Sequence, residues 1–307
     1  MDFTSVSGSI ILSGASGMLG SALRRVLDSR KVPTIQLVRR TPTGEGQLQW
    51  NPGAESAVEN PAPLEDATAA IHLSGTGIGA HRWTEAYRHE LAASRIDSTH
   101  RLAKVLAALR TPPRSFLVAS AVGIYGNRGD EVLSEASPPG TGFLADLCQQ
   151  WEAASEPAVQ AGIRVVHLRF GVVLGPKQGA LQQMLPPFRV GLGGRLGNGR
   201  QWMSWIGLAD AIAAILFALD HTDLSGPMNV TAPNPVTNAE FTRALGRQLH
   251  RPALLAVPAF AVRMMFGQMA DEALLASARV QPQKLLSAGF RFSLPEIDEA
   301  LRAALER

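Results

Sequence analysis

Three glycines, Gly14, Gly17 and Gly20, follow a short apolar run at three-residue intervals, and an amphipathic stretch begins directly after them. In a turn from strand to helix, the first glycine permits a strained backbone, the second lets a pyrophosphate approach, and the third lets the helix pack close to the strand. The middle glycine stands one place later than in the usual dehydrogenase fingerprint, and a purely structural turn is the alternative. We predict a dinucleotide-binding turn whose contacts are Gly14, Ala15, Ser16, Gly17, Met18 and Leu19.

Two arginines, Arg39 and Arg40, end the next β-branched run about 20 residues beyond the glycines. An acidic residue at this point would bind a free ribose 2′-hydroxyl and favour NAD. Two guanidiniums instead suit a 2′-phosphate, because they can donate charge-assisted and bidentate hydrogen bonds to it. The sequence therefore predicts NADP as the cofactor, the alternative being that both arginines belong to a solvated loop.

The elements that must position these residues alternate between short β-branched runs and amphipathic stretches. This alternation is typical of βαβ units and a parallel sheet covered on both faces. Thr84 and Glu85 are suitable for the start of a long helix that runs to Leu109. The expected fold class is α/β, a Rossmann doubly wound parallel sheet with a smaller C-terminal α+β substrate domain. The strands that we expect are SIILS, TIQLV, AAIHLS, SFLVAS and RVVHLRF.

The composition of the chain changes after Gly175, where Pro and Gly residues become frequent. We expect residues 1–175 to form the NADP-binding domain and residues 176–307 the smaller domain on the substrate side, with segment 204–232 returning to the first domain. An apolar stripe from Leu208 to Leu219 predicts a buried helix, beside which Asp210 acts as a cap or anchor. Residues 51–67 hold three prolines and a glycine, which indicates a surface excursion.

Together with AAIHLSG, SAVGIYG and LRFGVVLG, the glycine motif resembles the extended short-chain dehydrogenase/reductase superfamily over the first two thirds of the chain. The strings HLSGTGIGAHRWTEAYRHEL, GNGRQWMSWI and FGQMADEALLASARVQPQKLLSAGFRF are similar to an atypical group within it, the epimerase family proteins. Bacterial members of that group often carry a cell-division-inhibitor label, and the last string is similar to their C-terminal segment of unknown function. This resemblance covers nearly the whole chain.

The resemblance implies further site residues at the ends of three strands. It places Leu73, Ser74 and Gly75 beside the dinucleotide, and Phe170, Gly171 and Val172 in the turn that lines the nicotinamide. It implies that Ser120 is the active-site hydroxyl, which donates a hydrogen bond to a substrate carbonyl or alcohol. An ordinary serine at the end of a strand is the alternative.

Catalysis in the superfamily also uses a tyrosine that transfers a proton and a lysine four residues later that lowers its pKa. In the helix expected to carry this pair, the best register places Phe143 at the tyrosine position and Leu147 at the lysine position, and neither side chain can transfer a proton. Tyr125 in GIYG is the remaining tyrosine near Ser120, although its position matches a structural Tyr-Gly. Other polar residues in segments that we expect near the cleft are His81, Arg82, Arg200 and Ser204.

Composition sets limits on partners. The 307 residues carry 29 basic and 26 acidic side chains, a net charge of +3 without basic blocks, so we expect no nucleic acid partner. No basic, uninterrupted leader and no apolar run of membrane-spanning length is visible, so we expect no membrane partner and a cytoplasmic location. The single cysteine, Cys148, fits a reducing compartment and a structural thiol. We expect no metal, and the sequence leaves a homodimer open.

Three functions follow from these patterns. The first is an NADP(H)-dependent oxidoreductase that acts on an unknown small carbonyl or alcohol. The second is a non-catalytic NADP(H)-binding sensor or scaffold, which is suggested by Phe143 and Leu147. The third is a nucleotide-sugar epimerase, which would need the acid/base pair that we did not find.

Overall fold

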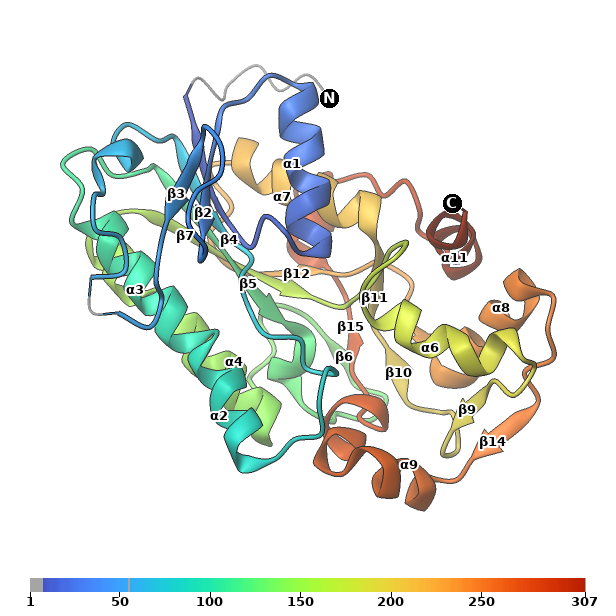
Figure 1. Cartoon of the computed structure of the whole chain (residues 1–307). Coiled ribbons are helices and arrows are strands. Elements are labelled where there is room, and N and C mark those ends of the chain that lie inside the picture. The colour runs from blue at the N-terminus through green and yellow to red at the C-terminus, as the bar shows by residue number, and fades with distance from the viewer. Residues whose placement is uncertain (1–7, 55, 307) are drawn as a thin grey trace.

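A computed structural model describes residues 8–54 and 56–306 and is built around a seven-stranded sheet in which every neighbouring pair is parallel (Figure 1). The strand order is β12-β7-β5-β4-β1-β2-β3. The chain runs outward from β1 and then returns to β4 on the other side of β1, so the order reverses between these two strands. Ligands of open α/β sheets bind at such a reversal, outside the carboxyl ends of the strands. The strands are β1 (Ile10–Ser13), β2 (Thr34–Val38), β3 (Gln47–Gln49), β4 (Ala69–His72), β5 (Ser115–Ala121), β7 (Arg164–Phe170) and β12 (Gly226–Val230).

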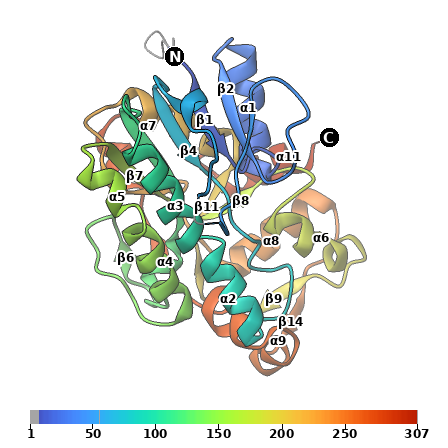
Figure 2. The same cartoon turned by 60° about the vertical axis from the view of Figure 1, so that its left-hand side comes forward.

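Helices cover both faces of this sheet. On one face α1 (Met18–Ser29) contacts α7 (Leu208–Asp220), and on the other face α3 (Ile96–Ala107) packs against both α4 (Phe143–Ala153) and α5 (Glu156–Gln160) (Figures 1 and 2). The central strands β1, β4 and β5 are almost fully buried, as expected for a parallel sheet with two covered faces, whereas β2 and β3 at one edge are only partly buried. The predicted doubly wound α/β fold is therefore confirmed.

The long helix expected from Thr84 to Leu109 is two helices. Thr84 caps α2 (Glu85–Ala93) by accepting from the Tyr87 amide, and a break precedes α3. At the break, the buried side chain of Arg95 donates to the carbonyl oxygens of Leu91 and Thr76. The expected single helix was wrong because no glycine or proline marks this interruption.

The segment 51–67 is only in part a surface excursion. It contains the short helix η1 (Ala62–Leu64), and Ala57, Val58 and Leu64 are buried in the main core. Its prolines do interrupt regular structure, but its apolar residues cover the core beside Trp50.

A smaller second core lies beside the sheet and is built from later parts of the chain. Trp205, Leu181, Leu185, Phe241 and Leu301 are its large buried side chains. Its elements are β8 (Val172–Leu174), α6 (Ala180–Arg189), β9 (Gly194–Leu196), β10 (Trp202–Met203), β11 (Trp205–Gly207), β13 (Val236–Thr237), α8 (Asn238–Leu249), β14 (Leu255–Val257), α9 (Ala259–Phe266) and α11 (Ile297–Leu305). The remaining elements are η2 (Val122–Tyr125), β6 (Val132–Leu133), η3 (Ala270–Leu274), β15 (Arg279–Val280) and α10 (Gln283–Ser287).

Residues 1–7, on which the expected lack of a leader partly rests, lie outside the described residues. Within the described residues, no helix is long and apolar enough to cross a bilayer. The same part of the chain holds no group of three or more His, Cys, Asp or Glu side chains arranged for a metal ion.

Candidate functional site

The glycine turn between β1 and α1 is tightly packed at two of its three glycines. Gly14 has φ +72°, and a Cβ there would lie 2.7 Å from the carbonyl carbon of Leu73. A Cβ at Gly20 would overlap the carbonyl oxygen of Gly14. Both positions thus require glycine, the first for backbone conformation and close approach and the second for helix packing.

Gly17 differs because it stands at the open end of α1. It is the N-cap residue, with no side chain to accept from the first helical amides, and a Cβ there would meet only the Gly14 oxygen, at 3.4 Å. The first amides of a helix have no partner within the helix and, with the helix dipole, favour an anion. This end of α1 therefore fits a pyrophosphate.

Arg39 and Arg40 directly follow β2, which is the neighbour of β1 in the sheet. Both side chains are exposed, and neither makes a hydrogen bond or an ion pair with another residue of the described ranges. Two unpaired guanidiniums beside the phosphate-binding turn fit an additional phosphate group.

The loop after β4 meets the glycine turn, as the sequence predicts for residues at one edge of a parallel sheet. The Leu73 amide donates to the Ser13 carbonyl oxygen, and Gly14 packs on the backbone of Leu73 and Ser74. A Cβ at Gly75 would lie 3.5 Å from Cζ of Arg95, and the Arg95 guanidinium donates to the Thr76 oxygen. Arg95 therefore packs against this loop and holds it in place. The supporting role of Arg95 was not predicted.

The turn after β7 lies farther along the same edge. Phe170 is buried, the Gly171 amide donates to the Val230 oxygen, and the Val172 amide donates to the Ser204 oxygen at 2.8 Å. A Cβ at Gly171 would lie 3.0 Å from the Thr231 methyl group, which explains why a residue without a side chain stands there. The structure thus brings Phe170, Gly171 and Val172 to the point where the chain leaves the main sheet for the second core.

A loop from the second core reaches the glycine turn. A Cβ at Gly175 would lie 2.8 Å from the Met18 sulfur, and one at Gly179 would lie 3.0 Å from its terminal methyl group. Residues 175–179 therefore lie against the first residue of α1, on the side where a dinucleotide would bind.

Ser120 and Tyr125, the two predicted catalytic residues, are both engaged in a buried polar network. The Ser120 hydroxyl donates to Glu152 at 2.7 Å, and the Tyr125 hydroxyl donates to the Asn229 side-chain oxygen at 2.7 Å and accepts from Arg169 at 3.0 Å. Ser120 is 3% exposed and Tyr125 is 0% exposed. Burial raises the pKa of the Tyr125 phenol. These contacts give both hydroxyls a positioning role, and their catalytic roles stay predictions.

An ion pair lies at the centre of this network. Arg169 of β7 donates through Nε and Nη2 to the two carboxylate oxygens of Glu152 on α4, each at 2.8 Å. Their side chains are only 8% and 12% exposed. The pair was not predicted, because the two residues come from different elements and become partners only through the fold.

Phe143 and Leu147 do lie on one helix, α4, and both pack against the same apolar cluster, but they differ in burial. The half-buried Phe143 ring packs edge-on to Trp83, with centroids 5.3 Å apart. Leu147 is 3% exposed within an apolar cluster with Tyr87 and Leu91. The hypothesis that both positions address the cleft is thus wrong for Leu147, because its side chain points into a core.

Cys148 follows on the same helix and is buried, which raises the pKa of its thiol to about 12. A thiol of this kind stays protonated and is a poor nucleophile. Its surroundings match the predicted structural thiol.

The other polar residues selected from the sequence have separate surroundings. The His81 ring packs edge-on to Tyr87, and Arg82 donates to the Met264 oxygen at 3.5 Å. Ser204 donates to the Ala278 oxygen and accepts from the Val280 amide, both structural contacts. Asp210 accepts from the amides of residues 293 and 294, so it anchors the C-terminal segment rather than its own helix.

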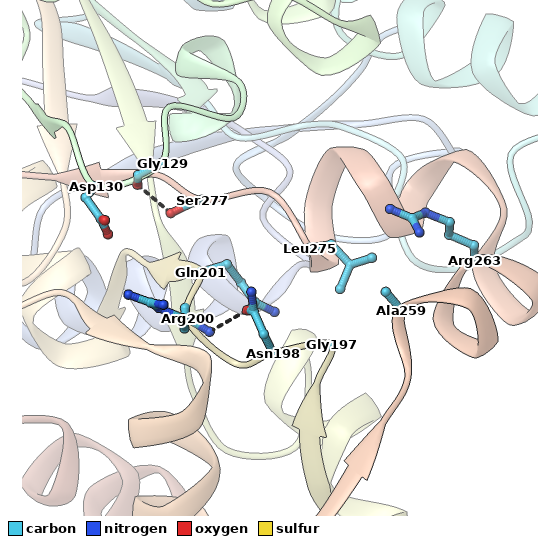
Figure 3. Close-up of a pocket in the computed structure, with 10 residues that line it drawn as sticks. All are labelled: Gly129, Asp130, Gly197, Asn198, Arg200, Gln201, Ala259, Arg263, Leu275 and Ser277. Carbon is cyan, nitrogen blue, oxygen red and sulfur yellow. Dashed lines mark hydrogen bonds between the residues drawn. The ribbon is translucent and has the colours of Figure 1, made fainter.

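Arg200 lines a cavity of about 410 Å³ between the β9–β10 turn, the loop before β6 and the segment from α9 to β15 (Figure 3). Most of the lining groups are polar, and two of them are guanidiniums, those of Arg200 and Arg263. Arg263 donates to Asp271 at 2.9 Å, whereas Arg200 makes no side-chain hydrogen bond or ion pair within the described ranges. The full lining is Gly129, Asp130, Gly197, Asn198, Arg200, Gln201, Ala259, Arg263, Leu275 and Ser277.

Comparison with known proteins assigns the chain to a family. A sequence model of the NAD dependent epimerase/dehydratase family matches residues 10–231, which include the glycine turn and all seven strands of the main sheet. The chain belongs to this family. A second model, described only as a domain of unknown function (DUF1731), matches residues 257–304.

Relatives within this epimerase/dehydratase family are similar over nearly the whole length of this chain. An epimerase family protein from Mycobacterium leprae is 46% identical, over 97% of this chain and 96% of the relative. The crystal structure of human epimerase family protein SDR39U1 (isoform 2) with NADPH has a TM-score of 0.87 at 33% identity and covers 96% of this chain and 98% of that one. A nucleoside-diphosphate sugar epimerase from Corynebacterium glutamicum has a TM-score of 0.79 at 32% identity, over 97% of this chain and 58% of that one. The predicted membership of the extended short-chain dehydrogenase/reductase group is thus confirmed.

The C-terminal segment that matches the domain of unknown function also contacts the part of the chain that matches the epimerase/dehydratase model. Glu272 of η3 accepts hydrogen bonds from the amides of Phe143 and Leu144, at 2.9 and 3.0 Å. A carboxylate at the N-terminus of α4 is stabilised by the helix dipole. The segment therefore fixes the helix on which the superfamily carries its catalytic pair, a contact across about 130 residues that sequence reasoning missed.

Proposed function

We propose that the protein binds NADP(H) in the crevice at the carboxyl ends of β1, β2 and β4. The carrying observation is the open N-terminus of α1 at Gly17, flanked by the unpaired guanidiniums of Arg39 and Arg40. The human relative whose structure was determined with NADPH supports the proposal. The amides from Gly14 to Leu19 would hold the pyrophosphate, and Arg39 and Arg40 the 2′-phosphate.

Replacement of both arginines should remove the preference for the phosphorylated cofactor. In the double variant Arg39→Ala/Arg40→Ala we expect NADPH affinity to fall by roughly 10- to 100-fold. Two charge-assisted contacts are lost, and exposure to water lowers the contribution of each to below the usual range of about 1.5 to 3 kcal/mol. NADH affinity should change little. Fluorescence titration of both nucleotides measures this, with Arg25→Ala on the surface of α1 as control. Equal affinity of the wild type for both nucleotides would contradict the prediction.

We propose further that the protein is an oxidoreductase of the short-chain dehydrogenase/reductase type, with an unknown small carbonyl or alcohol as substrate. A bound nicotinamide supplies or accepts hydride. The turn from Phe170 to Val172 would line the nicotinamide side, and the polar cavity at Arg200 offers space for a small polar substrate. No side chain is assigned as proton donor, since the Tyr125 and Ser120 hydroxyls are both engaged inside the network.

A non-catalytic NADP(H)-binding protein is the second candidate. It is favoured by Phe143 and Leu147 in place of the acid and the lysine, and by the burial of Tyr125. NADPH oxidation with a panel of aldehydes and quinones separates the two candidates. Turnover that is lost in a variant without nucleotide binding supports the enzyme, whereas tight NADPH binding with no turnover supports the second candidate. Epimerisation consumes no nucleotide overall, so an epimerase activity is tested separately, by incubating UDP-glucose with the protein and analysing the product for its epimer.

The location that we propose is the cytoplasm. The single cysteine is a buried free thiol, which fits a reducing compartment.

A further inference from the structure

Exposed apolar side chains are concentrated on one part of the surface. Seven large apolar side chains that are at least half exposed come from the turn after α6, from β14 and its preceding residue, and from α9. We call them the apolar ridge, and Leu254 is the most exposed of them, at 90%. The ridge consists of Val190, Leu192, Leu254, Leu255, Phe260, Met264 and Met265. Single exposed apolar residues are ordinary, but a group of this size marks an interaction surface.

These segments are neighbours in space. The strand β14 pairs with β9, and a Cβ at Gly191 would lie 3.6 Å from the ring of Pro252. The helix α9 follows β14 after one residue, and it turns Val262 inward and Met264 outward. Both views place the end of α6 together with β9, β14 and α9 along one side of the molecule, with α1 and its glycine turn apart from them (Figures 1 and 2).

A basic hollow adjoins the ridge at the C-terminal end of α8. It has a volume of about 630 Å³, and its lining includes Arg243, Arg247, His250 and Arg251 but no carboxylate. Arg247 is paired with Asp298 at 2.7 Å. Arg251 donates to the Arg189 carbonyl oxygen at 3.0 Å and Arg243 interacts with the charge of Glu240, but neither forms an ion pair within the described residues. Leu254 belongs to the same lining, so the most exposed apolar side chain and the cationic groups share one surface.

The combination of exposed apolar side chains and arginines distinguishes between two possible partners, a second copy of this chain and an anionic lipid surface. In a symmetric dimer formed by this face, the arginines of the hollow would be buried against a lining that offers no carboxylate, and buried charges without partners are costly in free energy. An anionic lipid surface attracts those arginines and accepts protruding Leu, Phe and Met side chains at the boundary between headgroups and acyl chains. The charge of the face therefore favours a lipid surface over a second copy.

We propose that the apolar ridge and the basic hollow bind the surface of a membrane that contains anionic lipids. The ridge side chains enter the headgroup region, and Arg243 and Arg251 contact lipid phosphates. This departs from the expectation of no membrane partner, which was drawn from the lack of a membrane span. The proposal is independent of the proposed NADP(H) binding, because the ridge lies apart from α1 and its glycine turn (Figures 1 and 2).

Vesicle co-sedimentation of the full chain tests the proposal. We expect binding to vesicles of phosphatidylcholine and phosphatidylglycerol in equal amounts, weakening as salt rises, and little binding to phosphatidylcholine alone. The variants Leu254→Asn/Met264→Asn and Arg243→Glu/Arg251→Glu should each lower binding by roughly tenfold or more. The matched controls, Val159→Asn/Leu286→Asn and Arg25→Glu/Arg114→Glu, change exposed residues elsewhere and should leave binding unchanged.

Thermal unfolding and NADPH titration of each variant show whether it is folded. The proposal is overturned if the wild type does not bind anionic vesicles. It is overturned as well if the control variants lose as much binding as the test variants. It is also overturned if light scattering finds a dimer that Leu254→Asn/Met264→Asn converts to a monomer, since the ridge would then be an interface between two copies. The proposal is supported if both test variants lose binding and both control variants keep it.

Discussion

The substitution Gly17→Leu should abolish NADPH binding and leave the fold intact. Gly17 has φ −73° and ψ 174°, a conformation that leucine adopts without strain, and a Cβ there meets no atom within 4 Å except the Gly14 oxygen at 3.4 Å. The new side chain would therefore extend into the space in front of α1, where the pyrophosphate must approach the amides. We expect NADPH affinity to fall by at least about 100-fold, equivalent to roughly 2.7 kcal/mol.

The stability cost of Gly17→Leu should stay near 1 kcal/mol, the usual cost of a poor N-cap residue. Gly44→Leu is a control for the added side chain, because a Cβ at Gly44 meets nothing within 4 Å and Gly44 lies beyond Arg40, the last expected contact of this loop. Titration of NADPH together with thermal unfolding measures both effects. NADPH binding by Gly17→Leu at wild-type strength would show that the cofactor lies elsewhere, and the proposed function would fail with it.

The main sheet and the glycine turn were predictable because their signals are local. Ile10, Ile11 and Leu12 form a continuous apolar run, as a strand buried on both faces must, and the glycines follow within the same stretch of chain. The edge at which Arg39 and Leu73 meet this turn then follows from parallel strand order alone.

The polar network was not predictable, because its members become partners only through the fold. Tyr125 and Asn229 are 104 residues apart, and the sequence around each of them gives no sign of the other. Tyr125 was thus a natural candidate for the acid from its position near Ser120, whereas its surroundings bury it completely. The break at Arg95 has the same origin, since its cause is the contact of a long side chain with a loop about 20 residues away.

Removal of the carboxylate at the centre of that network should be the most destabilising single change. In Glu152→Ala, the Arg169 guanidinium would lose two charge-assisted hydrogen bonds while it remains buried, with the Tyr125 hydroxyl as its remaining partner. Burial by itself lowers the pKa of Arg169, but the hydrogen bonds and charge of Glu152 outweigh burial and raise it. Because an uncompensated buried charge is costly, we expect a loss of roughly 3 to 5 kcal/mol in the free energy of unfolding.

The exposed pair of Arg128 and Glu131 provides the control for this prediction. Their ion pair is as short, at 2.7 Å, but the Arg128 side chain is 22% exposed and also donates to the Pro138 oxygen, so water and this carbonyl group remain available to it when Glu131 is removed. We expect Glu131→Ala to cost no more than about 1 kcal/mol. Urea unfolding of both variants measures the difference, and Ser120→Ala, which removes only one hydroxyl from Glu152, should lie between them. Equal losses for Glu152→Ala and Glu131→Ala would mean that Arg169 reaches water when its partner is gone, and that the network does not hold β7 and α4 together as we infer.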